Sequence, residues 1–213
     1  MVPGTRFSAE SGFFVCSSMN VVIIKYNAGN VQSVMYALDR LGVSYTYTDS
    51  EEEIRSADKV IFPGVGEAST AMAYLNEKGL SRLIPALKQP VLGTCIGLQL
   101  MCRHSEEGNV DCMGIFDVDV VRFPEQPGYK VPHMGWNSIS DYRSPILTEL
   151  PPNAYVYFVH SYYAPVCEYT AAVCEYINPF SAALQKDNFY AAQFHCEISG
   201  DAGQKVLESF LKI

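Results

Sequence analysis

Hydrophobic and polar residues follow two patterns along the first half of the chain. Short runs of mostly apolar residues occur at 21–24, 59–62 and 90–94, as is typical of strands that are buried on both faces of a sheet. Between and after them, apolar residues recur at helical spacing at 31–41 and 68–78. This alternation predicts parallel strands that are connected by helices.

The second half of the chain is richer in strand patterns. They occupy residues 115–123, 154–163, 170–176, 181–186 and 189–195. An amphipathic helix from Ala202 to Leu211 closes the chain. Because no linker, repeat or low-complexity segment divides these elements, we expect one α/β domain with a largely parallel, open twisted sheet flanked by helices.

Composition and charge narrow the possible functions. Of the 213 residues, 48% are hydrophobic and 18% are charged, which indicates a folded globular domain. The net charge of −8, without a Lys/Arg cluster, argues against binding to nucleic acid or to an anionic membrane. Seven cysteines without Cys-x-x-Cys or Cys/His pairs at ligand spacing predict neither a disulfide framework nor a metal site. We therefore expect a cytoplasmic protein whose partners are small molecules or another protein.

The first 18 residues differ from the rest of the chain. They lack the basic start and long apolar core of a secretory signal, and they contain no span that could cross a membrane. Met19 directly precedes the strand pattern that begins the first predicted element. We expect residues 1–18 to be a disordered leader or a remnant of expression cloning, and residues 19–213 to form the domain.

The sequence GTCIG places Cys95 in a tight turn between the strand at 90–94 and a helix that begins at Ile96. Open α/β sheets bind their ligands at this end of their strands. Gly93 and Gly97 give a G-x-C-x-G pattern analogous to the G-x-S-x-G nucleophile elbow. The start of a helix favours the reactive thiolate, and the Ile96 N–H can face charge that develops on an attacked carbonyl. A buried structural cysteine is the alternative.

A thiol nucleophile needs a base, and His195 is the best candidate among the four histidines. It ends an apolar strand pattern, with Glu197 two residues later. In an extended segment the two side chains point the same way, so Glu197 can orient the imidazole. A histidine that only packs in the core is the alternative for His195 alone.

These residues make the chain resemble class I (triad) glutamine amidotransferases, with their flavodoxin-like fold. Within that class it resembles the glutaminase subunits of imidazole glycerol phosphate synthase, an enzyme of histidine biosynthesis. Six stretches carry the resemblance: KYNAGNVQSVMYALDRLG (25–42), FPGVGEA (62–68), GTCIGLQLM (93–101), VPHMGWN (131–137), FVHSYY (158–163) and QFHCEIS (193–199).

The resemblance implies a catalytic triad. Cys95 would attack the side-chain amide of glutamine, His195 would protonate the departing ammonia and later activate water, and Glu197 would hold His195. The γ-glutamyl thioester formed on Cys95 would then be hydrolysed to glutamate. The Gly64–Val65 peptide would turn its N–H inward and complete the oxyanion hole beside Ile96, with glycine allowing unusual backbone angles. A plain turn is the alternative for PGVG.

The resemblance also implies a glutamine site. Its residues would be Gly66, Gln99, Glu107 and the backbone of Ser161 and Tyr162. A polar helix face is the alternative for Gln99 and Glu107. Neither a cofactor nor a metal ion is expected.

A partner is implied as well, because ammonia must be delivered without escaping into water. The resemblance implies a heterodimer with a (β/α)₈-barrel cyclase subunit, which releases imidazole glycerol phosphate and AICAR. Pro132, His133, Trp136 and Asn137 would lie at or near the interface. Trp136 is the single tryptophan and suits an interface anchor, although a buried core position is the alternative.

The chain departs from the family pattern F-H-P-E-K-S at two positions. Cys196 replaces the proline and places a second thiol next to the predicted base, and Ile198 replaces the lysine. Two other classes of function stay open, one suggested by the thiol at the elbow alone and one by these departures. One is a free-standing cysteine hydrolase of the related peptidase or deglycase group, and the other is a non-catalytic regulatory subunit.

Overall fold

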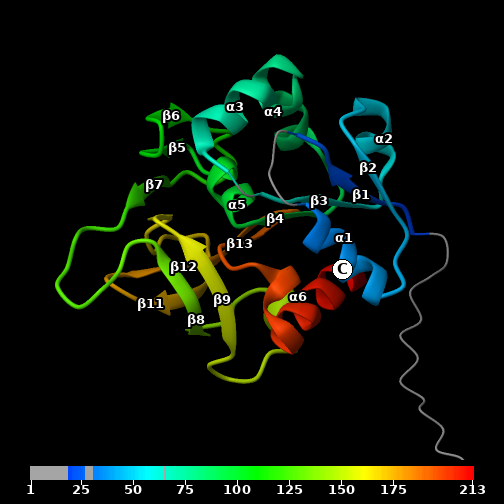
Figure 1. Ribbon diagram of the computed structural model, residues 1–213. Helices are drawn as coiled ribbons and strands as arrows, with labels where there is room; N and C mark the ends of the chain where they lie inside the picture. Colours follow the sequence, from blue (N-terminus) through cyan, green and yellow to red (C-terminus); the bar gives the residue numbers. More distant parts are fainter. Residues whose placement is uncertain (1–18, 27–30, 65) are drawn as a thin grey trace, which may run out of the picture.

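The structure is a computed structural model and describes residues 19–26, 31–64 and 66–213. The predicted leader, residues 27–30 and Val65 lie outside the described residues. Within the described residues, one mixed sheet of nine strands forms the centre of the molecule (Figure 1). Its parallel half contains β2 (Tyr45–Thr48), β1 (Val21–Ile24), β3 (Lys59–Phe62), β4 (Val91–Thr94) and β13 (Phe189–Ala192), in that order.

The antiparallel half of the sheet continues from β13. It contains β12 (Pro179–Lys186), β11 (Thr170–Glu175), β8 (His133–Ser140) and β9 (Tyr155–His160). This half comes from the part of the chain that is rich in strand patterns, where short connections favour antiparallel neighbours. The predicted α/β sheet flanked by helices is confirmed, and antiparallel strands extend its parallel half.

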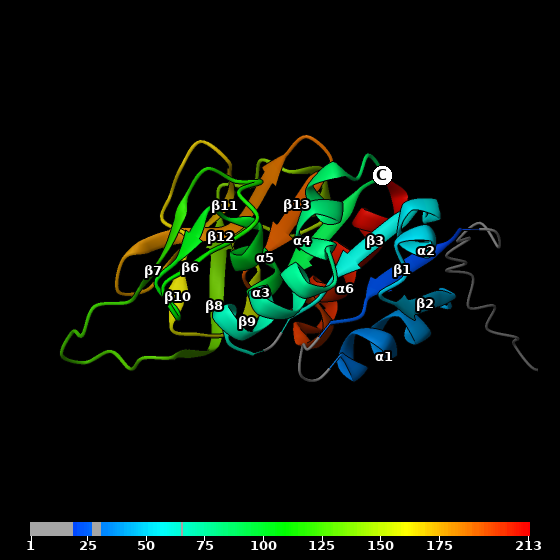
Figure 2. The same cartoon turned by 90° about the horizontal axis from the view of Figure 1, so that it is seen from above.

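Helices cover both faces of the sheet (Figures 1 and 2). One face carries α1 (Gln32–Arg40) and α6 (Gly200–Lys212). The other carries α2 (Glu51–Ser56), α3 (Ala68–Glu77), α4 (Leu80–Leu83) and α5 (Ile96–Met101). The helices predicted at 31–41, 68–78 and 202–211 are confirmed as α1, α3 and α6, because their apolar residues recur at the period of a helix, and α5 begins at Ile96 as predicted. The short helices α2 and α4 were not predicted.

Two hydrophobic cores form, one on each face of the sheet. Strand β1 contributes to both, because Val21 and Ile23 face the α1/α6 core whereas Val22 and Ile24 face the opposite one. All four side chains are fully buried, which explains why their sequence is continuously apolar. The described helices include none that is long and apolar enough to span a lipid bilayer.

A small second sheet lies beside the pocket described below. It contains β10 (Tyr162–Tyr163), β7 (Asp119–Arg122), β5 (His104–Ser105) and β6 (Val110–Asp111). The strand predicted at 115–123 is shorter than expected. Ile115 and Phe116 instead donate their backbone N–H groups to the carbonyl of Met101 in a turn.

Candidate active site

Cys95 lies in a strained turn between β4 and α5. Its backbone has φ 51° and ψ −111°, which is unusual for a residue with a side chain. Such strain persists only where the surroundings hold it, and here the Cys95 N–H donates to the carbonyl of Ala192 on β13. The predicted elbow is therefore present, at the carboxyl edge of the parallel strands.

Gly97 allows α5 to pack closely against the end of β3. A Cβ at this position would lie 2.2 Å from the backbone carbonyl oxygen of Phe62, which cannot move without displacing the strand. We expect Gly97→Ala to destabilise the protein by about 3 kcal/mol, to be measured as a lower urea midpoint at an unchanged slope.

Gly114→Ala is the matched control for this change. Gly114 has φ 64°, and a Cβ there would meet none of the described atoms within 4 Å. Its substitution tests backbone strain alone and should cost about 1 kcal/mol. Equal losses in the two variants would contradict the close-packing role of Gly97.

His195 and Glu197 form the predicted pair, but through a different backbone. Strand β13 ends at Ala192, and Cys196–Ile198 forms a 3-10 turn rather than an extended segment. The turn brings His195 Nδ1 and Glu197 Oε1 to 2.7 Å. Both side chains are more than nine-tenths buried. The prediction of an extended segment was wrong, although the contact that it implied is present.

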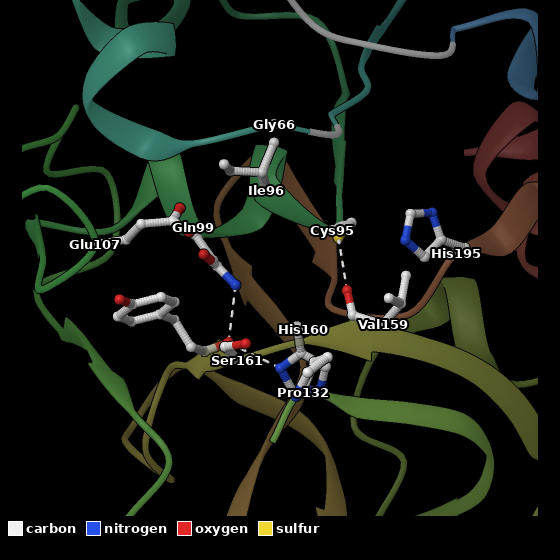
Figure 3. Close-up of a pocket in the computed structure, with 11 residues that line it drawn as sticks. Gly66, Cys95, Ile96, Gln99, Glu107, Pro132, Val159, His160, Ser161 and His195 are labelled. Carbon is white, nitrogen blue, oxygen red and sulfur yellow. Dashed lines mark hydrogen bonds between the residues drawn. The ribbon is translucent and has the colours of Figure 1, made fainter. Parts of the chain in front are cut away.

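The local charges favour a protonated His195. Burial disfavours the imidazolium, but the nearby Cys95 sulfur and the hydrogen bond to Glu197 outweigh it and raise the pKa of His195 to about 10. Figure 3 shows the imidazole beside the Cys95 thiol. Among the described residues, buried Nε2 of His195 has no fixed hydrogen-bond partner, so it is available to exchange a proton at the sulfur.

Cys196 does not place a second thiol in the site. Its side chain is buried in the core on the α1/α6 face and does not line the pocket. Burial raises the pKa of this thiol well above its ordinary value, which makes it unreactive.

One pocket of about 310 Å³ collects most of the predicted site residues (Figure 3). This volume is at the lower end of the range of roughly 300–1,000 Å³ for small-molecule sites. The predicted residues that line it are Gly66, Cys95, Ile96, Gln99, Glu107, Pro132, Ser161, Tyr162 and His195. Val159 and His160 also line it, although we did not predict either.

Two polar side chains of the pocket already have partners in its wall. Gln99 Nε2 donates to the carbonyl of Tyr162 at 2.9 Å, and it is almost fully buried. Glu107 accepts the backbone N–H of Ala68 at 2.9 Å. Burial raises the pKa of Glu107, the Ala68 N–H opposes that shift, and the nearby charge of Glu67 adds to it.

The loop after β3 needs its two glycines for different reasons. Gly66 has φ 132°, the unusual angle that was expected. Gly64 does not have a positive φ; instead a Cβ there would lie 2.0 Å from Ile96 Cγ2 and 2.6 Å from the Tyr26 hydroxyl. Glycine is therefore required at Gly64 by close approach to α5. Val65, the other half of the predicted oxyanion peptide, lies outside the described residues.

The predicted interface residues divide into buried and exposed ones. His133 is buried, and its ring stacks on Tyr176 at 3.9 Å and on Phe158 at 4.9 Å between centroids. Side chains alternate along β8, and that of His133 faces the core rather than the solvent. Asn137 is half-buried and donates to the Glu175 carbonyl, whereas Pro132 is exposed.

Trp136 is 54% exposed, which excludes the alternative of a core tryptophan. Met134 is 63% exposed on the same strand, and Tyr155 is 62% exposed on β9. Met134 and Trp136 are two residues apart, and Tyr155 pairs with Ser138 in the β8–β9 register. The three side chains therefore share one face of the hairpin, which we call the β8–β9 patch.

Comparison with known proteins agrees with this architecture. The profile of class-I glutamine amidotransferases matches residues 22–213. The chain belongs to this family. It is 60% identical over 196 residues to the imidazole glycerol phosphate synthase subunit HisH of Bacteroides fragilis, covering 92% of this chain and 100% of that protein. It is 44% identical to the protein of the same name from Idiomarina loihiensis, covering 92% and 98%.

Solved structures share the fold at much lower identity. A putative GMP synthase subunit from Thermoplasma acidophilum superposes with a TM-score of 0.70 at 18% identity, covering 91% of this chain and 92% of that one. A glutamine amidotransferase from Thermotoga maritima gives a TM-score of 0.61 at 16% identity, covering 90% and 82%. At these identities, the likeness supports the fold alone.

Proposed function

We propose that this chain is the glutaminase subunit of an imidazole glycerol phosphate synthase, and that Cys95, His195 and Glu197 hydrolyse glutamine to glutamate and ammonia. One observation carries the proposal. A cysteine in a strained elbow and the His195–Glu197 pair meet at a single pocket in a chain that is 60% identical to a HisH protein over nearly its whole length.

The reaction follows from the positions of these groups. Cys95 Sγ attacks the side-chain carbonyl carbon of glutamine, and the carbonyl electron pair moves onto its oxygen. When the tetrahedral intermediate collapses, the C–N bond breaks and His195 Nε2 gives a proton to the departing ammonia. Water then adds to the thioester with His195 as base, which releases glutamate and restores the thiol. Glu197 holds the Nδ1–H and stabilises the imidazolium.

The oxyanion needs donors on the side of the turn next to α5. Ile96 begins α5, so its N–H is one of the groups at a helix start that have no acceptor within the helix. The Gly64–Val65 peptide is proposed as the second donor. The close packing of Gly64 on Ile96 supports this role, because it keeps Gly64 next to the start of α5.

Glutamine would lie along the pocket away from His195. Glu107 supplies a carboxylate for the α-ammonium group, and it lies across the pocket from Cys95 (Figure 3). Gly66, Gln99 and the backbone of Ser161 and Tyr162 surround the remaining atoms. The bound side-chain amide then points at the sulfur.

The ammonia would pass to a cyclase subunit with a (β/α)₈ barrel. The β8–β9 patch is a suitable docking face, because a tryptophan and a methionine there are each more than half exposed. Strand β8 also begins directly after Pro132, which lines the pocket, so docking at this face lies close to the source of ammonia.

The proposal is tested by measuring glutamate release from glutamine by this chain alone, with the cyclase subunit, and with the cyclase plus its ribonucleotide ligand. We expect low activity alone and an increase on the order of 100-fold in the full mixture, because the partner completes the oxyanion hole. Trp136→Ala should lower this increase. Tyr36→Ala is the control: it removes an aromatic ring that is 57% exposed on α1, and it should leave the increase unchanged.

The same assay addresses the other two classes of function. Steady hydrolysis that is indifferent to the partner would identify a free-standing hydrolase. No glutamate release in any mixture, and no trapping of Cys95 by a reactive glutamine analogue, would identify a regulatory subunit. Either result would overturn the proposal.

A further inference from the structure

Gln193 is a buried amide that touches the sulfur of Cys95. It follows β13 directly, it has no solvent exposure, and its backbone N–H donates to the carbonyl of Ala182. Its side-chain Nε2 lies 4.0 Å from Cys95 Sγ. Its Oε1 accepts a hydrogen bond from Gln99 Nε2 at 3.1 Å. A fully buried amide next to a nucleophile is costly unless each of its polar atoms has a partner.

The carbonyl of Tyr162 fixes the orientation of both amides. A carbonyl oxygen only accepts, so the group of Gln99 that lies 2.9 Å from it must be the NH₂ group. The same NH₂ group faces Gln193, so Gln193 must present its oxygen to Gln99. It follows that the NH₂ group of Gln193 faces the sulfur and is a donor there.

His160 holds the Tyr162 carbonyl from the other side, and His133 in turn holds His160. His160 Nδ1 lies 2.8 Å from it and must be the N–H, which leaves Nε2 of His160 as an acceptor for His133 Nδ1 at 3.2 Å. His133 Nε2 is then an acceptor that faces the NH₂ group of Asn137 at 3.4 Å. Donors and acceptors match along the whole series, so the structure has one consistent set of tautomers.

These histidines stay neutral at physiological pH. Burial lowers the pKa of His133 to about 4. Burial also lowers the pKa of His160 to about 3 and outweighs the opposing effect of the hydrogen bond to Tyr162. The direction of each hydrogen bond is therefore preserved across the pH range in which a glutaminase works.

We propose that Gln193 is a positioning residue for the nucleophile: its NH₂ group donates to the Cys95 sulfur, stabilises the thiolate and holds it toward the pocket, and Gln99 and the Tyr162 carbonyl keep that NH₂ group in place. The inference rests on the proposed role of Cys95 as nucleophile. It assigns Gln99 a second task besides lining the glutamine pocket. Gln193 itself does not line the pocket, so its effect falls on the sulfur and not on substrate binding.

The test compares the pH dependence of Cys95 alkylation by iodoacetamide in the wild-type chain and in Gln193→Met, followed by peptide mass spectrometry. Methionine has a similar volume but no N–H donor. We expect the midpoint of the alkylation profile to move up by about one pH unit, since a hydrogen bond to a charged group is lost. In the complex, kcat should fall while KM for glutamine stays the same.

Gln185→Met is the matched control. Gln185 lies on the neighbouring strand β12, away from the pocket, and its replacement should leave the alkylation profile in place. An unchanged profile in Gln193→Met would overturn the inference. Wild-type Cys95 that reacts with neither iodoacetamide nor a reactive glutamine analogue would instead overturn the proposed function.

A second measurement uses the wild-type chain and does not depend on the folding of a variant. The side-chain amide protons of Gln193, followed by NMR, should titrate with the same midpoint as Cys95 alkylation and lose that titration in Cys95→Ala. Amide protons that do not respond to pH over this range would overturn the inference.

Discussion

Replacing Cys95 by alanine lowers glutamine-dependent synthesis in the assembled enzyme by on the order of 10⁴-fold or more, and it leaves ammonia-dependent synthesis intact. The loss is large because, among the residues that the structure describes, no other thiol lines the pocket. Cys196 is next to His195 in sequence, yet its side chain is buried in the core. Ammonia-dependent synthesis should persist, because the proposed division of labour leaves the use of ammonia to the partner subunit. Both activities are measured in the same complex, with glutamine or an ammonium salt as nitrogen source.

Cys112→Ala is the control for this result. Cys112 is a partly buried thiol near β6, outside the pocket, and its removal should leave both activities unchanged. If Cys95→Ala abolished ammonia-dependent synthesis as well, the chemistry would not be divided between two subunits. If it abolished neither, Cys95 would not be the nucleophile.

The sequence alone predicted the elbow well because its constraints are local. A strand that is buried on both faces must be apolar, a helix must follow it, and the small residues around Cys95 must allow the turn. Gly97 shows why the pattern is so strict, since its missing Cβ lets α5 contact the carbonyl of Phe62. Such requirements fall on neighbouring residues and are therefore readable in the sequence.

The parts that sequence reasoning missed depend on long-range contacts. The backbone around His195 was expected to be extended, but α6 packs against it so closely that a Cβ at Gly203 would lie 1.9 Å from the carbonyl of Cys196. The glycine at position 203 indicates this close packing, but the strand pattern that ends at His195 led us to expect an extended backbone. His133 belongs to a motif that suggested an interface, whereas the pairing of β8 with β9 directs it into an aromatic cluster.

Gln193 illustrates the same limit. It stands in the stretch QFHCEIS that carried the resemblance, but no spacing rule connects it with Gln99, which is 94 residues away. Only the folded chain shows that these two amides and the Tyr162 carbonyl meet. A polar residue of a motif can thus have a role that depends on contacts with residues far away in the sequence.

Glu197→Gln lowers kcat by about 10³- to 10⁴-fold with little change in KM, by analogy with the loss of the orienting acid in other triads. The carboxylate accepts from His195 Nδ1 at 2.7 Å and stabilises the imidazolium. An amide at this position can donate to Nδ1 and thereby place the proton on Nε2, which is the wrong tautomer for a base. Glu208→Gln on α6, a partly exposed glutamate that accepts from Gln204 one helical turn away, is the matched control.

Glu197→Gln also changes the stability of the protein in a way that depends on pH. The sign of this effect follows from the raised pKa of His195. A histidine with a folded-state pKa of about 10 and an ordinary value of 6.5 contributes stability that is fully present below pH 6.5 and is lost as the pH rises toward 10. Glu197→Gln removes part of that contribution. The free energy of unfolding should therefore fall by about 2 kcal/mol at pH values near 6.5. This deficit should shrink as the pH rises toward 10. A deficit that grows with pH would mean that Glu197 does not stabilise a protonated His195.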